Sequence, residues 1–231
     1  MSTPILLVPG LNCTAECYAG QIASLWQFGP VQVANHKRGA TMAEIAAAIL
    51  RDAPPEFALA GFSMGGYIAF ELLRQAPGRI TRLALIDTMA RLDTPEGLHK
   101  RHEAIRLAES GRHRQLVAAN YALSVHPDNA ENAAVRDISI RMAVENGPEV
   151  YVRQQQAIIG RPDSTPDLAG IRVPTTIIVG EADAITPVAD AQAMAAAIPA
   201  ANLVTIAGAG HMSPTEQPAV VASALAKWLS K

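Results

Sequence analysis

The alternation of short apolar runs with longer alanine-rich segments constrains the fold of this chain more than any other feature of its sequence. The runs, rich in leucine or β-branched residues, are Ile5–Val8, Val31–Ala34, Phe57–Phe62, Leu83–Ile86, Thr175–Val179 and Leu203–Ile206. The segments between them have apolar residues at helical spacing and are Glu16–Gln27, Met42–Arg51, Met64–Gln75, Pro187–Ile198 and Pro218–Leu229. Because the runs are almost continuously apolar, we expect helices on both of their faces. The pattern predicts an α/β fold with a doubly wound, mostly parallel sheet of six strands.

The alternation is interrupted between Thr88 and Asp167, where no strand-like run occurs. This stretch predicts consecutive helices, at Pro95–Glu109, Arg112–Leu123, Asn129–Val144 and Val150–Ile159. It is flanked by a polar linker at residues 93–95 and a turn-rich one at residues 161–166. We therefore expect a core of residues 1–88 and 168–231, with a helical cap, residues 89–167, inserted over one edge of the sheet.

Composition excludes several classes of protein. Hydrophobic residues are 49% of the 231, which suits one large core, and the formal net charge of −2 does not suit a nucleic-acid binder. The apolar runs fall short of the roughly 18 residues that span a bilayer, and no Lys or Arg before Lys37 supplies the basic start of a secretory signal. Two cysteines, Cys13 and Cys17, make no disulfide framework and are expected to be small buried thiols. We expect a cytoplasmic protein that acts on a small molecule, with neither nucleic acid nor membrane as partner; its oligomeric state stays open.

The strongest chemical signal is Gly61-Phe62-Ser63-Met64-Gly65-Gly66, which fits the pattern G-x-S-x-G. It stands between a predicted strand and a predicted helix, where a sharp turn would expose the Ser63 hydroxyl above the sheet edge. The alternative is a glycine-rich turn with a capping serine, but the strand–turn–helix context favours a nucleophile.

A serine nucleophile needs a base, and the chain has six histidines. Three of them, His99, His102 and His113, lie among basic residues of the predicted cap and are expected on a solvated helix face. His36 ends the second strand, where it could face the cleft, but a structural or solvent-facing role is the favoured interpretation. His211 follows the last strand through a glycine-rich loop, which leaves the sheet at the edge where Ser63 is expected. We therefore predict His211 as the base.

The base needs a carboxylate that orients it and stabilises its protonated form. Asp183 lies just after the fifth strand, which gives the chain order Ser63, Asp183, His211. Asp87, after the fourth strand, and Glu181 are the alternative acids. We prefer Asp183 because its loop is next to the histidine's loop.

Acyl transfer also requires donors for an oxyanion. One is predicted to be the backbone N–H of Met64, the residue after the nucleophile. The other is expected from the loop after the first strand, with Leu11 as the candidate and Asn12 as the alternative. Neither assignment depends on a side chain, so position alone supports them.

These motifs resemble the α/β-hydrolase fold superfamily, and more closely its small bacterial serine hydrolases and esterases with a helical cap. The resemblance covers Pro9-Gly10, residues 61–66, Gly180–Pro187 and residues 208–211. It implies a core that lacks the first two strands of the family, a catalytic triad of Ser, His and Asp, and a site beneath the cap. The chain departs from the family in having Pro9-Gly10 where His-Gly is usual. A serine nucleophile disfavours the dehalogenases and epoxide hydrolases, which use aspartate.

The prediction from sequence is a serine hydrolase that cleaves a carboxylic ester, a thioester or a lactone through an acyl-enzyme. One alternative keeps the triad but hydrolyses a C–C bond or performs perhydrolysis; another is a non-catalytic ligand-binding protein. No cofactor is expected, because neither a G-x-G-x-x-G nor a G-x-x-x-x-G-K-[ST] motif occurs. No metal is expected either, since no third ligand has suitable spacing to His99 and His102.

Overall fold

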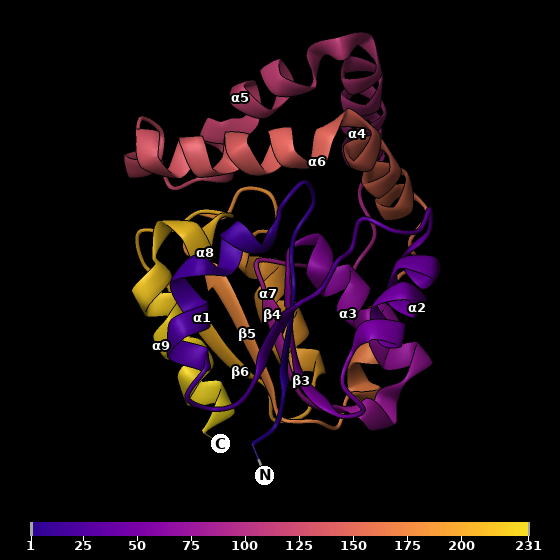
Figure 1. Ribbon diagram of the computed structural model, residues 1–231, viewed down its shortest axis with the longest axis vertical. Helices are drawn as coiled ribbons and strands as arrows, with labels where there is room; N and C mark the ends of the chain where they lie inside the picture. The colour runs from indigo at the N-terminus through magenta and orange to yellow at the C-terminus, as the bar shows by residue number, and fades with distance from the viewer. Residues whose placement is uncertain (1, 231) are drawn as a thin grey trace.

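Six parallel strands form a single sheet in the computed structural model, which describes residues 2–230 (Figure 1). The strands are β1 (Ile5–Val8), β2 (Val31–Val33), β3 (Phe57–Phe62), β4 (Ile80–Ile86), β5 (Thr175–Gly180) and β6 (Asn202–Ile206). Their order across the sheet is β2-β1-β3-β4-β5-β6, and every pairing is parallel. Because the chain first winds outward from β1 to β2 and then returns past β1 to β3, the sheet is doubly wound. The predicted fold class is confirmed.

Helices cover both faces of the sheet. They are α1 (Ala19–Leu25), α2 (Met42–Asp52), α3 (Met64–Gln75), α7 (Val188–Ala197), the short α8 (Ser213–Glu216) and α9 (Pro218–Leu229). In Figure 1, α1 and α9 flank one face, and α2 and α3 flank the other. Side chains of β1 divide between the two cores, since Leu6 and Val8 join one buried cluster while Ile5 and Leu7 join the other. This is the period of two that a strand buried on both faces requires.

β4 begins earlier than its apolar run predicts. Its first residue is Ile80 rather than Leu83, because the pairing register with β3 shifts between Phe57 and Ala58 and so admits Ile80 as a partner of Phe57. The polar residues Thr81 and Arg82 are only partly buried, which hid this part of the strand from an apolar pattern.

Three helices lie over the upper edge of the sheet in Figure 1, where β1, β3 and β5 end. We call α4 (Pro95–Leu107), α5 (His113–Ser124) and α6 (Ala133–Ile159) the cap helices. A π-helical turn at residues 108–112 joins α4 to α5. The two last helices expected from the sequence are one element, α6, which is broken internally at Gly147 with φ +74°.

One expectation for the cap helices is wrong. His113 is buried rather than solvated, and its ring lies 4.9 Å from the ring of Tyr151 in α6. The basic residues around it, Arg112 and Arg114, are exposed as expected. α5 therefore turns His113 inward against α6 while its basic neighbours face solvent.

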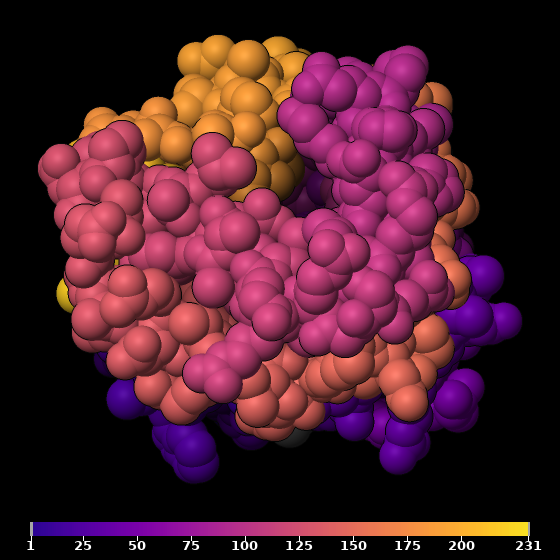
Figure 2. All heavy atoms as spheres, turned by 90° about the horizontal axis from the view of Figure 1, so that it is seen from above, coloured from indigo at the N-terminus to yellow at the C-terminus, as the bar shows by residue number. Residues whose placement is uncertain are grey.

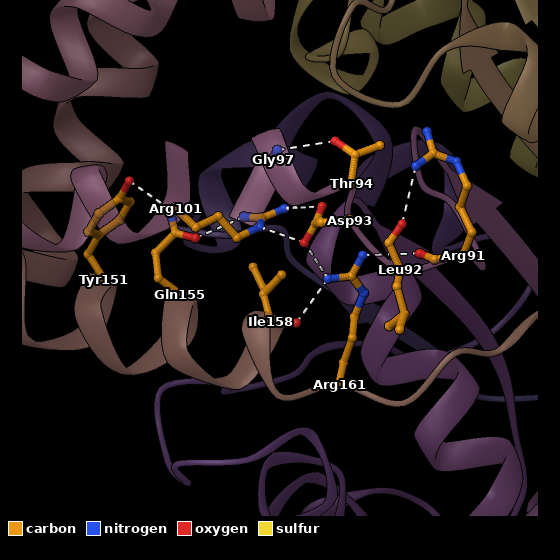
Figure 3. Close-up of polar contacts among 10 residues, drawn as sticks. All are labelled: Arg91, Leu92, Asp93, Thr94, Gly97, Arg101, Tyr151, Gln155, Ile158 and Arg161. Atoms are coloured by element: carbon orange, nitrogen blue, oxygen red, sulfur yellow. Dashed lines mark hydrogen bonds and ion pairs between the residues drawn. The ribbon is translucent and has the colours of Figure 1, made fainter. Parts of the chain in front are cut away.

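An ion cluster ties both ends of the cap helices together (Figure 3). The Asp93 carboxylate accepts hydrogen bonds from Arg101 Nε at 2.8 Å and from Arg161 Nη1 at 2.7 Å. The Arg161 guanidinium also lies over the ring of Tyr67 in α3, 4.3 Å from its centroid. Burial alone would raise the pKa of Asp93, but the two guanidinium groups lower it below its ordinary value. We call Asp93, Arg101 and Arg161 the neck clasp, because they join the entrance of α4 and the exit of α6 to the core.

The neck clasp continues into the cap helices. Arg101 Nη1 donates to Gln155 Oε1 at 2.8 Å, and Gln155 Nε2 donates to the hydroxyl of Tyr151 at 2.8 Å, the chain of contacts drawn in Figure 3.

Within residues 2–230, no helix combines the length and the apolar character that crossing a bilayer demands.

Candidate active site

The turn between β3 and α3 places Ser63 above the edge of the sheet. Ser63 has φ +53° and ψ −116°, a backbone conformation that costs energy for a residue with a side chain. The turn is so tight that a Cβ added at Gly65 would lie 2.1 Å from the carbonyl oxygen of Val8, and one added at Gly61 would lie 2.3 Å from that of Gly65. Only glycine fits at these two positions, as the G-x-S-x-G pattern predicts.

Three side chains from distant parts of the sequence meet at this turn. Ser63 Oγ lies 2.8 Å from His211 Nε2, and His211 Nδ1 lies 2.9 Å from Asp183 Oδ2. An ionised carboxylate only accepts hydrogen bonds, so Nδ1 of the imidazole carries the proton that it donates to Asp183. Nε2 is then free to accept the hydrogen of the Ser63 hydroxyl. This is the geometry that a general base needs in order to activate a serine.

Asp183 is held by its own loop. Its Oδ1 accepts from the backbone N–H groups of Ile185 and Thr186, both at 2.8 Å, and its Oδ2 accepts from the Thr186 hydroxyl at 2.7 Å. Burial opposes ionisation of Asp183, but the charge of His211 and these hydrogen bonds lower the pKa of the carboxyl below its ordinary value. A carboxylate fixed in this way orients the imidazole.

The electrostatics of His211 follow from its position. Burial favours the neutral ring, yet the neighbouring Asp183 carboxylate outweighs this effect and raises the pKa of His211 above its ordinary value. A protonated imidazole at this position is therefore stabilised by the neighbouring carboxylate.

The two alternative acids occupy other places. Asp87 is fully buried and accepts from Gly180 N at 2.8 Å and from Ser213 Oγ at 2.5 Å, so it ties the loops of Asp183 and His211 together without touching the imidazole. Burial and then the nearby Asp183 charge raise the pKa of Asp87 well above its ordinary value. Glu181 accepts from the backbone N–H of Gly208. Of the three carboxyl groups, Asp183 is the one in contact with His211.

The backbone N–H groups of Met64 and Leu11 are the oxyanion donors predicted from the sequence, and they come from different parts of the chain. Met64 opens α3, and Leu11 follows Gly10, where an added Cβ would lie 3.2 Å from Ser63 Cβ. Neither N–H has an acceptor among residues 2–230. The N–H of Asn12, in contrast, donates to Gln154 Oε1 at 2.9 Å and is thus occupied. This contact favours Leu11 over Asn12 as the second oxyanion donor.

Backbone strain gathers at the same edge of the sheet. Four non-glycine residues of the described chain have positive φ, and three of them, Asn12, Ser63 and Asp87, directly follow or closely follow β1, β3 and β4. The fourth, Ala200, precedes β6 at the opposite edge. Strained residues persist where the surrounding structure imposes them, and they are frequent at functional sites.

The cap helices reach this edge through direct contacts with the loop after β1. Gln154 of α6 bonds to Asn12, and Asn146 Nδ2 donates to the carbonyl oxygen of Cys13 at 3.1 Å. From above, the cap helices cover much of the edge and leave a hollow between α4 and the orange segment around α7 (Figure 2). The hollow is the visible opening toward the interior on this face.

The structure adds two polar contacts beside the site that the sequence did not indicate. His36, expected to be structural or solvent-facing, is buried with Nε2 2.9 Å from the carbonyl oxygen of Gly10, which agrees with the structural role and excludes the solvent-facing one. Gln154 lies 142 residues from its partner Asn12, so no local pattern indicates the contact. Cys13 and Cys17 are free, buried thiols, as predicted.

Comparison with known proteins agrees with the fold. An esterase from Thermogutta terrifontis superposes with a TM-score of 0.89 at 30% identity over 99% of this chain and 89% of its own. The enol-lactonase from Burkholderia xenovorans gives a TM-score of 0.89 at 25% identity over 100% of this chain and 92% of its own. By sequence, 3-oxoadipate enol-lactonase 1 of Acinetobacter baylyi is 28% identical over 159 residues, 68% of this chain. The match spans 58% of that relative, less than two thirds of its length.

The family pattern itself extends over nearly the whole chain. The model of the alpha/beta hydrolase family matches residues 5–224. This range includes both edge strands of the sheet, β2 and β6, and all three cap helices. The resemblance inferred from residues 61–66 and the loops of Asp183 and His211 is thereby confirmed. This chain belongs to the alpha/beta hydrolase family.

Proposed function

We propose that the protein is a serine hydrolase that cleaves a carboxylic ester, a thioester or a lactone of a small molecule through an acyl-enzyme on Ser63. The observation that carries the proposal is the continuous hydrogen-bonded chain from Ser63 Oγ through His211 to Asp183. The esterase and enol-lactonase names of the two structural relatives support the same class of substrate. The buried free thiols support the cytoplasm as the place of the reaction.

In the acylation half, Ser63 Oγ attacks the carbonyl carbon of the substrate while its proton passes to His211 Nε2. Asp183 stabilises the resulting imidazolium, whose positive charge lies next to the carboxylate. The developing oxyanion accepts hydrogen bonds from the N–H groups of Met64 and Leu11. His211 then donates its new proton to the leaving oxygen or sulfur, and the acyl group stays on Ser63.

Deacylation repeats these steps with water as the nucleophile. Water loses its proton to His211 Nε2 as it attacks the acyl carbon, and the Ser63 oxygen leaves and recovers that proton. The products are a carboxylic acid and an alcohol or thiol, or a single hydroxy or oxo acid when the substrate is a lactone. In this proposal residues 89–167 form a cap that selects the substrate, since α4 and α6 border the covered edge.

Turnover of short p-nitrophenyl esters by wild type and Ser63→Ala tests the proposal. We expect the substitution to remove turnover almost completely, by about 10⁴-fold or more. Ser110→Ala is the matched control, because Ser110 is exposed in the π-helical turn between α4 and α5, where its hydroxyl bonds to the Leu107 carbonyl. Ester turnover that survives Ser63→Ala would overturn the proposal. Wild type that cleaves a 1,3-diketone or performs perhydrolysis but leaves esters and lactones intact would overturn the substrate class and keep the triad.

A further inference from the structure

We propose that His36 is a positioning residue of the oxyanion hole: its imidazole holds the peptide between Gly10 and Leu11 so that the Leu11 N–H points toward Ser63. The inference rests on the proposed function, since an oxyanion hole has a purpose only in acyl transfer. It assigns a role to a buried histidine that the triad does not use.

The hydrogen bond from His36 has a defined direction. His36 follows β2 and is 2% exposed, and its Nε2 lies 2.9 Å from the carbonyl oxygen of Gly10. A carbonyl oxygen only accepts, so Nε2 must carry the hydrogen. Burial lowers the pKa of His36 to about 4, and the ring is therefore neutral at the pH where a serine hydrolase works. His36 is a fixed, uncharged donor to the loop.

The geometry of the peptide group transmits this bond to the oxyanion hole. Gly10 C=O and Leu11 N–H belong to one peptide unit, and no cis bond occurs within residues 2–230. In a trans peptide these two groups point in opposite directions. When His36 fixes the carbonyl on one side of the loop, the Leu11 N–H is fixed on the other. A Cβ added at Gly10 would lie 3.2 Å from Ser63 Cβ, so this loop passes beside Ser63, and the proposal places the Leu11 N–H on the side of that residue.

The next peptide unit is fixed from the cap helices. Asn12 N–H donates to Gln154 Oε1 at 2.9 Å, and Asn12 has φ +62°. Leu11 is therefore bracketed, with His36 of the core holding the peptide before it and Gln154 of α6 holding the peptide after it. The Leu11 side chain also packs against the cap cluster of Ala104 and Tyr151. The N–H between the two fixed points has little freedom to rotate.

One further donor limits the expected effect. The Gly10 carbonyl also accepts from Cys13 N–H at 3.1 Å, so loss of His36 loosens the loop without freeing it. Removal of a whole oxyanion donor costs about 10²–10³ in kcat in serine hydrolases. A donor that is present but poorly aimed costs less, and we expect a loss of roughly ten- to hundredfold.

Two amide substitutions at position 36 distinguish a side chain that bonds to the Gly10 carbonyl from one that is polar but does not reach it. The Nε2 of glutamine reaches the place of the histidine Nε2, whereas the amide of asparagine ends near the place of Nδ1 and does not reach Gly10. We expect His36→Asn to lower kcat for an ester by roughly ten- to hundredfold with KM within about twofold of wild type, and His36→Gln to keep kcat within about threefold. A trifluoromethyl ketone, which adds to Ser63 and forms an oxyanion, should lose affinity for His36→Asn by the same factor as kcat/KM.

Arg79→Leu is the matched control. Arg79 also holds a loop through backbone carbonyls, donating to Leu50, Ala53, Pro54 and Pro55, but it lies just before β4, at the end of the sheet away from Ser63. We expect it to lower the thermal midpoint while kcat and the affinity for the ketone stay at wild-type values. A loss of stability alone is thereby distinguished from a loss of oxyanion stabilisation.

The outcomes separate this inference from the proposed function. If wild type shows no turnover that depends on Ser63, the proposed function fails and the role of His36 fails with it. If turnover depends on Ser63 but His36→Asn and His36→Gln have the same kcat and the same affinity for the ketone, the inference alone is overturned. A loss in His36→Asn that appears only in KM would also overturn it, because a misaimed oxyanion donor acts on the transition state.

Discussion

The core and the cap helices of this protein are held together in different ways. In the core, chain segments approach so closely that side chains are excluded: an added Cβ at Gly65 would lie 2.1 Å from a backbone oxygen. In α6, a Cβ added at Gly147 would meet no other part of the chain within 4 Å, and this residue is constrained by its φ of +74° instead. Close contact therefore requires glycine at this turn of the core, whereas backbone conformation favours it at the break in α6.

The distribution of buried apolar side chains shows the same contrast. Two large clusters fill the faces of the sheet, whereas the cap helices have one small cluster of their own, built on Ala104, Ala108 and Tyr151. Other buried residues of the cap helices, such as Tyr121 and Ile158, belong to the clusters of the core. The cap helices therefore depend on the core for their packing. In our account the core supplies the reacting groups and the His36 bond that aims the loop of Leu11, while the cap governs access and holds the next peptide through Gln154.

The largest effect is expected from the core. His211→Ala removes the base and should lower kcat for an ester by about 10⁴- to 10⁶-fold, with little change in the circular dichroism spectrum. His99→Ala, an exposed histidine of α4, should leave kcat unchanged. Steady-state kinetics of both variants measures the difference. Similar losses of kcat in the two variants would contradict the assignment of the reacting groups to the core alone.

Asp183→Asn tests the assignment of Asp183 as the partner of His211 and is expected to lower kcat by about 10³- to 10⁴-fold. The pH dependence of kcat/KM shows the direction of this electrostatic effect. The Asp183 carboxylate raises the pKa of His211, so His211 stays protonated and inactive to higher pH. In wild type, the fall of kcat/KM on the acid side should therefore have its midpoint above about pH 6.5. Without that charge burial prevails, and the midpoint should move to lower pH. A midpoint that stays in place would contradict the pairing of these two residues.

The neck clasp is expected to affect stability more than chemistry. Asp93→Ala leaves the guanidinium of Arg161, which is 3% exposed, without its carboxylate and should lower the free energy of unfolding by about 3 kcal/mol. Glu96→Ala breaks an exposed pair with Lys100 and should have no measurable effect. Urea titration compares the variants. A loss of kcat in Asp93→Ala as large as in His211→Ala would show that the clasp is part of the catalytic machinery.

The smallest effect is expected at the break in α6. Gly147→Ala forces a side chain into a conformation that favours glycine and should cost about 1–3 kcal/mol of stability, although nothing obstructs the new methyl group. Gly170→Ala is the control, because its surroundings are equally open and its φ is not positive. Equal thermal midpoints for the two variants would mean that the cap is not constrained at Gly147.

Much of the core was predictable because its signals are local. α3 and α9 begin and end where the sequence pattern places them, since a nucleophile turn precedes one and a proline opens the other. The candidate residues Ser63, Asp183 and His211 follow three strands whose parallel arrangement brings their ends to one edge. Strand order and loop position were sufficient to nominate them.

The contacts that escaped prediction are those between distant segments of chain. The bond of His36 to Gly10 spans 26 residues and that of Gln154 to Asn12 spans 142, and neither His36 nor Gln154 belongs to a motif. His113 was wrongly placed in solvent because its neighbours in sequence are basic, whereas packing of α5 on α6 decides which side is buried. Patterns along the chain indicate elements; which polar group meets which backbone atom depends on how the elements pack.

Covalent labelling of the intact protein with a fluorophosphonate tests the central claim most directly. The account predicts a single adduct in the wild-type protein, located by peptide mass spectrometry on Ser63, and labelling that is slowed at least a thousandfold in His211→Ala. A wild-type protein that stays unmodified, or one whose adduct lies on another residue, would contradict the assignment of Ser63 as the nucleophile.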